Sequence, residues 1–213
     1  MVTAPPLRTD SPVYWFLMQI GMVTGFSFAN GVLTQLPTSP VSSGQDGGAA
    51  ALTVDGTDHF LYVANPSASN PPPFASTVGN LTGFSIDQDT GELKSILGSP
   101  FAATNGKNPS AITVDPSGRF VYAVTPGSSF SIWCFQITPE NGQLTPVTNS
   151  PFSQAGGEIF ALIDPSGNYF YIGSEASKGI AGYTYDPSTG VPTVITGSPF
   201  STGVAPGGFA LSE

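Results

Sequence analysis

The sequence is poor in charge, because only 19 of its 213 residues are Asp, Glu, Lys or Arg. A disordered chain combines high charge with few apolar residues, whereas 39% of this chain is hydrophobic. The Glu, Lys, Ala and Leu residues that fill helix surfaces are also too few for a helical protein. What remains is a β-rich protein, whose 26 Gly and 21 Pro residues are expected at its many turns.

Basic residues, cysteine and histidine are scarcer still. Five Lys and Arg face 14 Asp and Glu, and the net charge of −9 argues against nucleic acid and anionic membranes as partners. Cys134 is the one cysteine, so it forms no internal disulfide, and its apolar neighbours predict a buried core residue. His59 is the one histidine, which limits triad or multi-histidine chemistry. We expect no metal and no cofactor.

Residues 13–29 form the longest apolar stretch of the chain. Gln19 interrupts the stretch, and Pro5, Pro6 and Pro12 crowd its start. We therefore expect β-strands there rather than a signal peptide. No segment reaches the roughly 20 apolar residues of a membrane helix.

A set of motifs recurs along the chain at intervals of 48 to 60 residues. A Ser-Pro pair followed by Phe or Val occurs at residues 39–41, 99–101, 150–152 and 198–200. An Asp turn followed by an aromatic strand begins at residues 54, 114 and 163. An aromatic strand followed by a Gly turn spans residues 25–33, 83–93, 135–144 and 182–191.

Each unit is predicted to form four short strands, A to D in chain order. In the third unit they are expected at about 110–114, 119–125, 130–137 and 143–148. Asp-Pro-Ser-Gly suits the A–B hairpin, because Pro presets φ and Gly accepts a left-handed conformation. An Asn-Gly or Thr-Gly pair suits the C–D hairpin. The predicted fold class is all-β: a β-propeller of four-stranded antiparallel blades.

The units assign about four blades to the chain. We expect strands B to D of a first blade at 12–37, blade two at 48–97, blade three at 109–148, blade four at 157–196, and strand A of a next or closing blade at 206–212. The favoured arrangement is an arc of a seven-bladed propeller, since seven blades of this size need roughly 340 residues. The alternative is a closed four-bladed ring in which the two ends of the chain share a blade.

The motif set resembles the lactonase family of seven-bladed propellers, the bacterial group that includes 6-phosphogluconolactonase, with its YVTN-type repeats. The resemblance lies in the run from Asn108 to Tyr122, in Gly-x-Leu of strand D and in Gly-Ser-Pro-Phe before the next blade, and it covers about residues 13–213. It implies a lactone hydrolase that uses a histidine, a glutamate and an arginine near the central channel. His59 stands where the other blades have Arg119 and Asn168, so no catalytic residue is carried over by motif.

Two rims follow from the alternating direction of the strands. The A–B and C–D hairpins share one rim with 8 of the 14 acidic residues, and turn chemistry explains those residues better than a calcium loop at Asp87–Gly91. The D–A linkers and B–C loops share the other rim, which varies more between the units and is where we expect a functional site. The Pro-rich loop at 66–77 lies there and could cover a pocket or contact a partner.

We name six candidate site residues on the linker rim. Glu158 begins an innermost strand, where a carboxylate can act as general acid or base. Lys107 can hold an anionic group as a point charge. The remaining ligand-binding candidates are Asp46, Asn108, Glu175 and Lys178.

Three functions stay open on the sequence alone. The first is a lactonase-like propeller that binds a small polar ligand or hydrolyses a sugar lactone such as 6-phosphogluconolactone. The second is a non-catalytic binding or scaffold propeller, for which the composition favours a periplasmic or extracellular location. The third is a truncated product without independent activity. Self-association through open blade edges is compatible with each of them.

Overall fold

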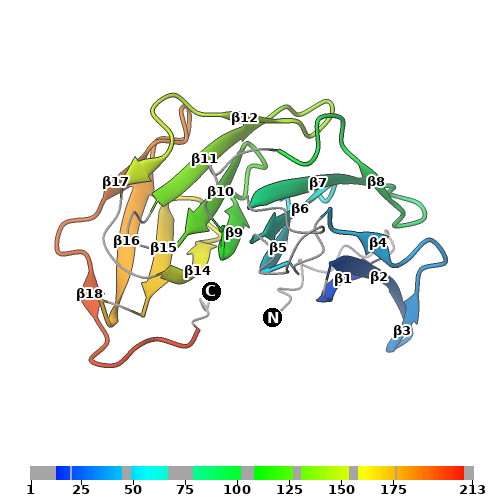
Figure 1. Ribbon diagram of the computed structural model, residues 1–213, viewed down its shortest axis with the longest axis horizontal. Coiled ribbons are helices and arrows are strands. Elements are labelled where there is room, and N and C mark those ends of the chain that lie inside the picture. Colours follow the sequence, from blue (N-terminus) through cyan, green and yellow to red (C-terminus); the bar gives the residue numbers. More distant parts are fainter. Residues whose placement is uncertain are drawn as a thin grey trace, which may run out of the picture.

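A computed structural model describes residues 13–19, 21–44, 49–66, 79–101, 108–126, 131–153, 158–175 and 177–208. Every regular element in these ranges is a β-strand, and every strand pairing is antiparallel. The strands form four sheets that follow one another along the chain and fan out as an open arc (Figure 1). The predicted all-β propeller architecture is therefore confirmed. In the described residues the first and fourth sheets lie apart at the two ends of the arc, an arrangement that favours the arc over the closed four-bladed ring.

We number the sheets blade one to blade four in chain order. Blade one contains β1 (Val13–Gln19), β2 (Met22–Ala29), β3 (Val32–Gln35) and β4 (Val41–Ser42). Blade two contains β5 (Ala51–Val54), β6 (Phe60–Asn65), β7 (Asn80–Ile86) and β8 (Leu93–Ser95). Blade three contains β9 (Ala111–Val114), β10 (Phe120–Thr125), β11 (Ser131–Ile137), β12 (Leu144–Pro146) and β13 (Phe152–Ser153). Blade four contains β14 (Glu158–Ile163), β15 (Tyr169–Ser174), β16 (Gly179–Tyr185), β17 (Pro192–Val194) and β18 (Phe200–Ser201).

The inner strands β5, β9 and β14 lie next to one another at the centre of the arc (Figure 1). Each blade then runs outward through two long strands to a short outer one. All six residues of β6 and all six of β10 are buried, as expected for strands that are apolar on both faces and covered on both sides. Cys134 is also fully buried, and burial raises the pKa of its thiol to about 12.

The Ser-Pro segments belong to the sheets, although we expected them to be linkers. In each blade the chain leaves the outer strand D and passes through a cis Ser-Pro peptide. The segment that follows pairs with strand C, as β13 does with β11. In every blade the serine hydroxyl accepts a hydrogen bond from a backbone N–H of strand C, at 2.5 to 3.0 Å. The outer edge of a blade thus consists of a short strand D and a second short segment after the Ser-Pro peptide, as with β12 and β13 in blade three. Residues 206–208 lie outside strands, and 209–212 lie outside the described residues.

The C–D turns also differ from the expectation of a two-residue hairpin. Only blade one has that turn, at Asn30 and Gly31, both with positive φ. In blade two the turn is longer, because the N–H of Gly91 bonds to the carbonyl of Asp87 at 2.8 Å. Blades three and four repeat this bond at 2.8 Å, with Gly142 and Gly190 as donors.

Those three turn glycines form the contacts between neighbouring blades. Gly91, Gly142 and Gly190 have φ near +72°, which favours glycine. A Cβ on any of them would lie 2.5 to 2.6 Å from an aromatic ring of the preceding blade. The rings belong to Tyr14, Phe60 and Phe120, respectively, each at the start of a strand B. Glycine is therefore required both by the backbone conformation and by the close approach of the ring.

A tyrosine hydroxyl completes each of these contacts. Tyr62 donates to the carbonyl of Gly142 at 2.8 Å, and Tyr122 donates to that of Gly190 at 2.9 Å. Burial raises the pKa of both hydroxyls, so they stay protonated as donors. Blade one has Phe16 at the matching position, and Tyr14 instead donates to the carbonyl of Asp89 at 2.7 Å. Each pair of neighbouring blades is thus joined by an aromatic ring and a tyrosine hydroxyl, and between blades one and two Tyr14 supplies both.

Replacing a turn glycine between blades tests this joint. We expect Gly142→Ala to destabilise the chain by about 2 kcal/mol beyond the backbone cost, because its Cβ would overlap Phe60 and Ile96. The control is Gly203→Ala, where φ is +75° and an added Cβ meets nothing within 4 Å, so that only a backbone cost of about 1 kcal/mol applies. The free energy of unfolding of both variants is measured by chemical unfolding. Equal losses in Gly142→Ala and Gly203→Ala would contradict close packing at the joint.

Candidate functional site

The hairpin rim consists of the A–B and C–D turns, and its acidic residues hold those turns together. One carboxylate oxygen of Asp115 accepts the N–H groups of Arg119 and Phe120, and the other accepts the hydroxyl of Ser117. Asp55 and Asp164 repeat this pattern in blades two and four. Asp55 and Asp115 are each only 2% exposed. The turn interpretation of these aspartates is confirmed.

The C–D turns use their aspartates in a similar way. Asp87 accepts hydrogen bonds from the N–H groups of Asp89 and Thr90 and from the Thr90 hydroxyl, and these bonds lower the pKa of the carboxyl group. Asp186 caps the corresponding turn of blade four. Among the described residues, no group of three or more His, Cys, Asp or Glu side chains is close enough to hold a metal ion.

The single histidine also lies on the hairpin rim. His59 follows the Asp55 turn, and its Nδ1 lies 3.0 Å from the hydroxyl of Thr57. Its backbone N–H donates a hydrogen bond to the carboxylate of Asp55, with an N–O distance of 2.9 Å. His59 is therefore at the opposite end of its blade from the linker rim.

On the linker rim, Glu158 is the first residue of β14, as predicted. Its backbone pairs with Ser174, which is fully buried, and the register shifts between Glu158 and Phe160. Such bulges redirect side chains and are common beside functional sites. The inner strand of blade four has six residues, compared with four in β5 and β9, so it reaches further toward this rim.

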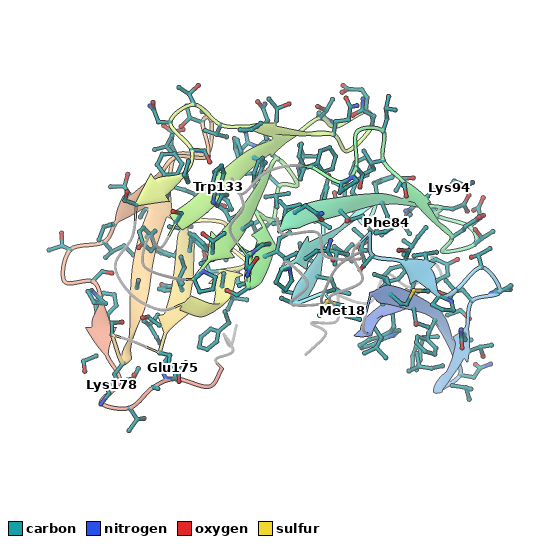
Figure 2. All side chains as sticks on the ribbon, in the orientation of Figure 1. Met18, Phe84, Lys94, Trp133, Glu175 and Lys178 are labelled. Carbon is teal, nitrogen blue, oxygen red and sulfur yellow. The ribbon has the colours of Figure 1, made fainter. Side chains whose placement is uncertain are left out.

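The B–C loop of blade four brings two further candidates close to Glu158 along the neighbouring strand. Glu175 follows Ser174 directly, and Lys178 donates its N–H to the carbonyl of Glu175 at 3.3 Å. Both side chains are exposed at the same end of blade four (Figure 2). The carbonyl of Lys178 accepts the N–H and hydroxyl of Thr202 at 2.9 Å, which ties this loop to the chain that follows β18.

The remaining candidates are less well defined. Asn108 is exposed just before β9, the inner strand next to β14, so it belongs to the same rim as Glu158. Asp46, Lys107 and nearly all of the 66–77 loop lie outside the described residues. The structure therefore groups Glu158, Glu175 and Lys178 on blade four and places Asn108 on the neighbouring blade.

A buried polar cluster at the linker rim was missed by the sequence analysis. The Asn65 amide, fully buried at the end of β6, donates to the Ser43 carbonyl, the Asn80 side chain and the Thr82 hydroxyl at 2.9 to 3.1 Å. Thr82 in turn donates to Ser43 at 2.6 Å, which links blade two to blade one. β10 and β15 also end in a buried polar residue, Thr125 and Ser174. A polar residue at the end of each strand B was therefore the sequence signal that could have indicated this cluster.

The hairpin-rim network makes stability depend on pH. Burial raises the pKa of Asp164, but hydrogen bonds from Ser166, Tyr169 and Asn168 lower it more, so that its net shift is downward. A carboxyl group with a lowered folded pKa stabilises the fold above its unfolded pKa, and the contribution is lost as the pH falls through the folded pKa.

We therefore expect the stability of the native chain to fall as the pH drops from about 5 toward 3, and to fall less steeply in Asp164→Asn. Chemical unfolding at several pH values measures this. Glu140→Gln, on the same rim with an exposed side chain, is the control for the loss of one charge. Parallel curves for native protein and Asp164→Asn would show that the network contributes nothing to the pH dependence.

Comparisons with known proteins agree on the fold. A family model described as "Lactonase, 7-bladed beta-propeller" matches residues 20–124 and 95–203. A candidate 6-phosphogluconolactonase from Bacteroides uniformis is 21% identical with a TM-score of 0.69, and the alignment covers 93% of this chain and 58% of that one. A search of the curated proteins found no match.

Two other solved structures are similar at the level of the fold. A protein from Lactobacillus plantarum is 14% identical with a TM-score of 0.65, over 93% of this chain and 58% of that one. The periplasmic gluconolactonase PpgL of Pseudomonas aeruginosa is 16% identical with a TM-score of 0.61, over 88% and 53%. The chain thus spans 53 to 58% of the length of these three proteins. No helix of the described residues is long and apolar enough to cross a membrane.

Proposed function

Because the chain belongs to the lactonase family of seven-bladed β-propellers, we propose that it hydrolyses a sugar lactone at its linker rim. The observation that carries the proposal is the position of Glu158, at the rim end of the innermost strand of blade four and beside a register shift. The names of two similar structures refer to gluconolactone hydrolysis, which supports this substrate class. 6-Phosphogluconolactone is the substrate that we propose to test first.

In the proposed reaction Glu158 acts as the general base. Its carboxylate takes a proton from a water molecule as the water oxygen attacks the lactone carbonyl carbon. The bond between that carbon and the ring oxygen then breaks, and the ring oxygen receives the proton and leaves as a hydroxyl. The product is the open hydroxy acid. Lys107 would hold the phosphate group as a point charge, and Asp46, Asn108, Glu175 and Lys178 would bind the sugar hydroxyls.

The location of histidine favours a second function, non-catalytic binding of the same class of ligand. The only histidine of the chain, His59, lies on the hairpin rim with its ring nitrogen beside Thr57. A histidine–glutamate pair therefore cannot form around Glu158 within one chain. If the rim binds a sugar acid without accelerating hydrolysis, the chain is a binding module of the lactonase family.

The test is the rate of 6-phosphogluconolactone hydrolysis above the spontaneous rate. We expect Glu158→Gln to lower the protein-dependent rate by about 10²- to 10⁴-fold, the usual contribution of a general base. The control is Glu140→Gln, which removes the same charge from an exposed position on the opposite rim and should keep full activity.

Calorimetric binding of 6-phosphogluconate separates the two functions. Acceleration that Glu158→Gln abolishes supports the hydrolase. Saturable binding without acceleration supports the binding module and rejects the hydrolase. A folded sample that neither binds nor hydrolyses would reject both functions.

A further inference from the structure

The two ends of the arc each leave one sheet face uncovered, and the two faces are complementary. Inside the arc, one face of each blade presents aromatic rings from strand B, and the next blade covers those rings with a turn glycine and apolar side chains. Among the described residues, no blade covers this first kind of face on blade four. In the same part of the chain, no blade lies against the second kind of face on blade one (Figure 1).

Blade four repeats the ring positions of blades two and three. Tyr169 pairs with β16 at the register at which Phe60 pairs with β7 and Phe120 with β11. Phe60 and Phe120 are 8% and 2% exposed under the next blade, whereas Tyr169 is 43% exposed. Tyr171 takes the place of Tyr62, and Phe200 on the same face is 44% exposed.

Blade one has a similar covering face, built around its tighter two-residue turn. Gly31 precedes Leu33 by two residues, as Gly91 precedes Leu93 and Gly142 precedes Leu144. An added Cβ on Gly31 would meet nothing within 4 Å, although the same atom on Gly91 or Gly142 would strike a ring.

The apolar side chains beside this glycine are uncovered in the same way. Phe28 and Leu33 form a cross-strand pair that is 38% and 52% exposed. The equivalent pair in blade three, Ile137 and Leu144, is 2% and 8% exposed because blade two covers it.

We propose that a second copy of this chain docks its blade one onto blade four of the first copy. Gly31 and its neighbours Phe28 and Leu33 would cover Tyr169, Tyr171 and Phe200, as the turn of each inner blade covers the blade before it. The contact joins two different faces, so it is heterologous. Two such contacts would close two arcs into a ring of eight blades, which is within the range of known propellers. This assembly does not depend on the proposed function.

The test is the molar mass in solution, measured by light scattering over a wide range of concentrations. A native dimer with twice the 21.9 kDa of the monomer is expected. Gly31→Asn should make the chain monomeric, since Asn tolerates the φ of +79° but its side chain would strike the docked ring. The control is Gly98→Asn in an outer loop, where blade three already carries Asn149 with positive φ, and this variant should stay dimeric.

A second variant tests the other face. Tyr169→Lys places a charge on the blade-four face at an already exposed position and should also give monomers. Because each variant damages a different face, an equal mixture of the two retains one intact contact and should form dimers again. Circular dichroism of each variant establishes that it is folded, and if one variant fails to fold, the other decides.

Several results would overturn the proposal. A native chain that is monomeric at every concentration would reject the contact between copies. A dimer that survives both folded variants would place the contact elsewhere. Two monomeric variants that do not dimerise when mixed would indicate a contact between identical faces.

Discussion

The contact between a strand-B ring and the turn glycine of the next blade is the interaction on which the whole arc depends. A four-stranded blade of this size cannot bury its two apolar faces alone, so its stability comes largely from its neighbours. The joint fixes their distance, because a ring lies where any side chain on the glycine would be. It also fixes their direction, because the hydroxyls of Tyr62 and Tyr122 each reach one defined carbonyl. The ring face exposed on blade four and the glycine face exposed on blade one are the two halves of such a joint.

The two rims of the arc differ in how far their residues are committed to holding the fold. The hairpin rim is committed to structure, since Asp55, Asp115 and Asp164 each hold a turn through several hydrogen bonds. The joints between blades also use the hairpin side, through Gly91, Gly142 and Gly190. The linker rim is less repetitive: it carries a buried amide cluster at Asn65, a fully buried Ser174 and a bulge at Glu158. Variation on this rim can change the ligand without disturbing the packing between blades.

Much of the fold could be predicted from the sequence because its determinants are local and repeated. The Asp-Pro-Ser-Gly turn and the apolar strand after it appear within a dozen residues, and β9 to β11 begin and end within one residue of their predicted bounds. The Ser-Pro return to strand C was not predicted, since the serine and its donor on strand C are 14 to 16 residues apart. The Asn65 cluster was missed for the same reason: its partners Ser43 and Thr82 lie 22 and 17 residues away. The repeat pattern predicted that Glu158 begins an inner strand. It did not predict the register shift beside Glu158, because that shift depends on how β14 pairs with β15.

Native-state hydrogen exchange of Tyr122→Phe measures whether contacts between neighbouring blades hold the arc together. This change removes one hydroxyl, the donor to Gly190, and leaves the ring in the joint between blades three and four. We expect the amides of blade four to become less protected by about 1–2 kcal/mol, the order of the cost of losing one buried hydrogen bond, while those of blades one and two keep their protection. Unchanged protection in blade four, or an equal loss in all four blades, would contradict a fold held together by joints between neighbours.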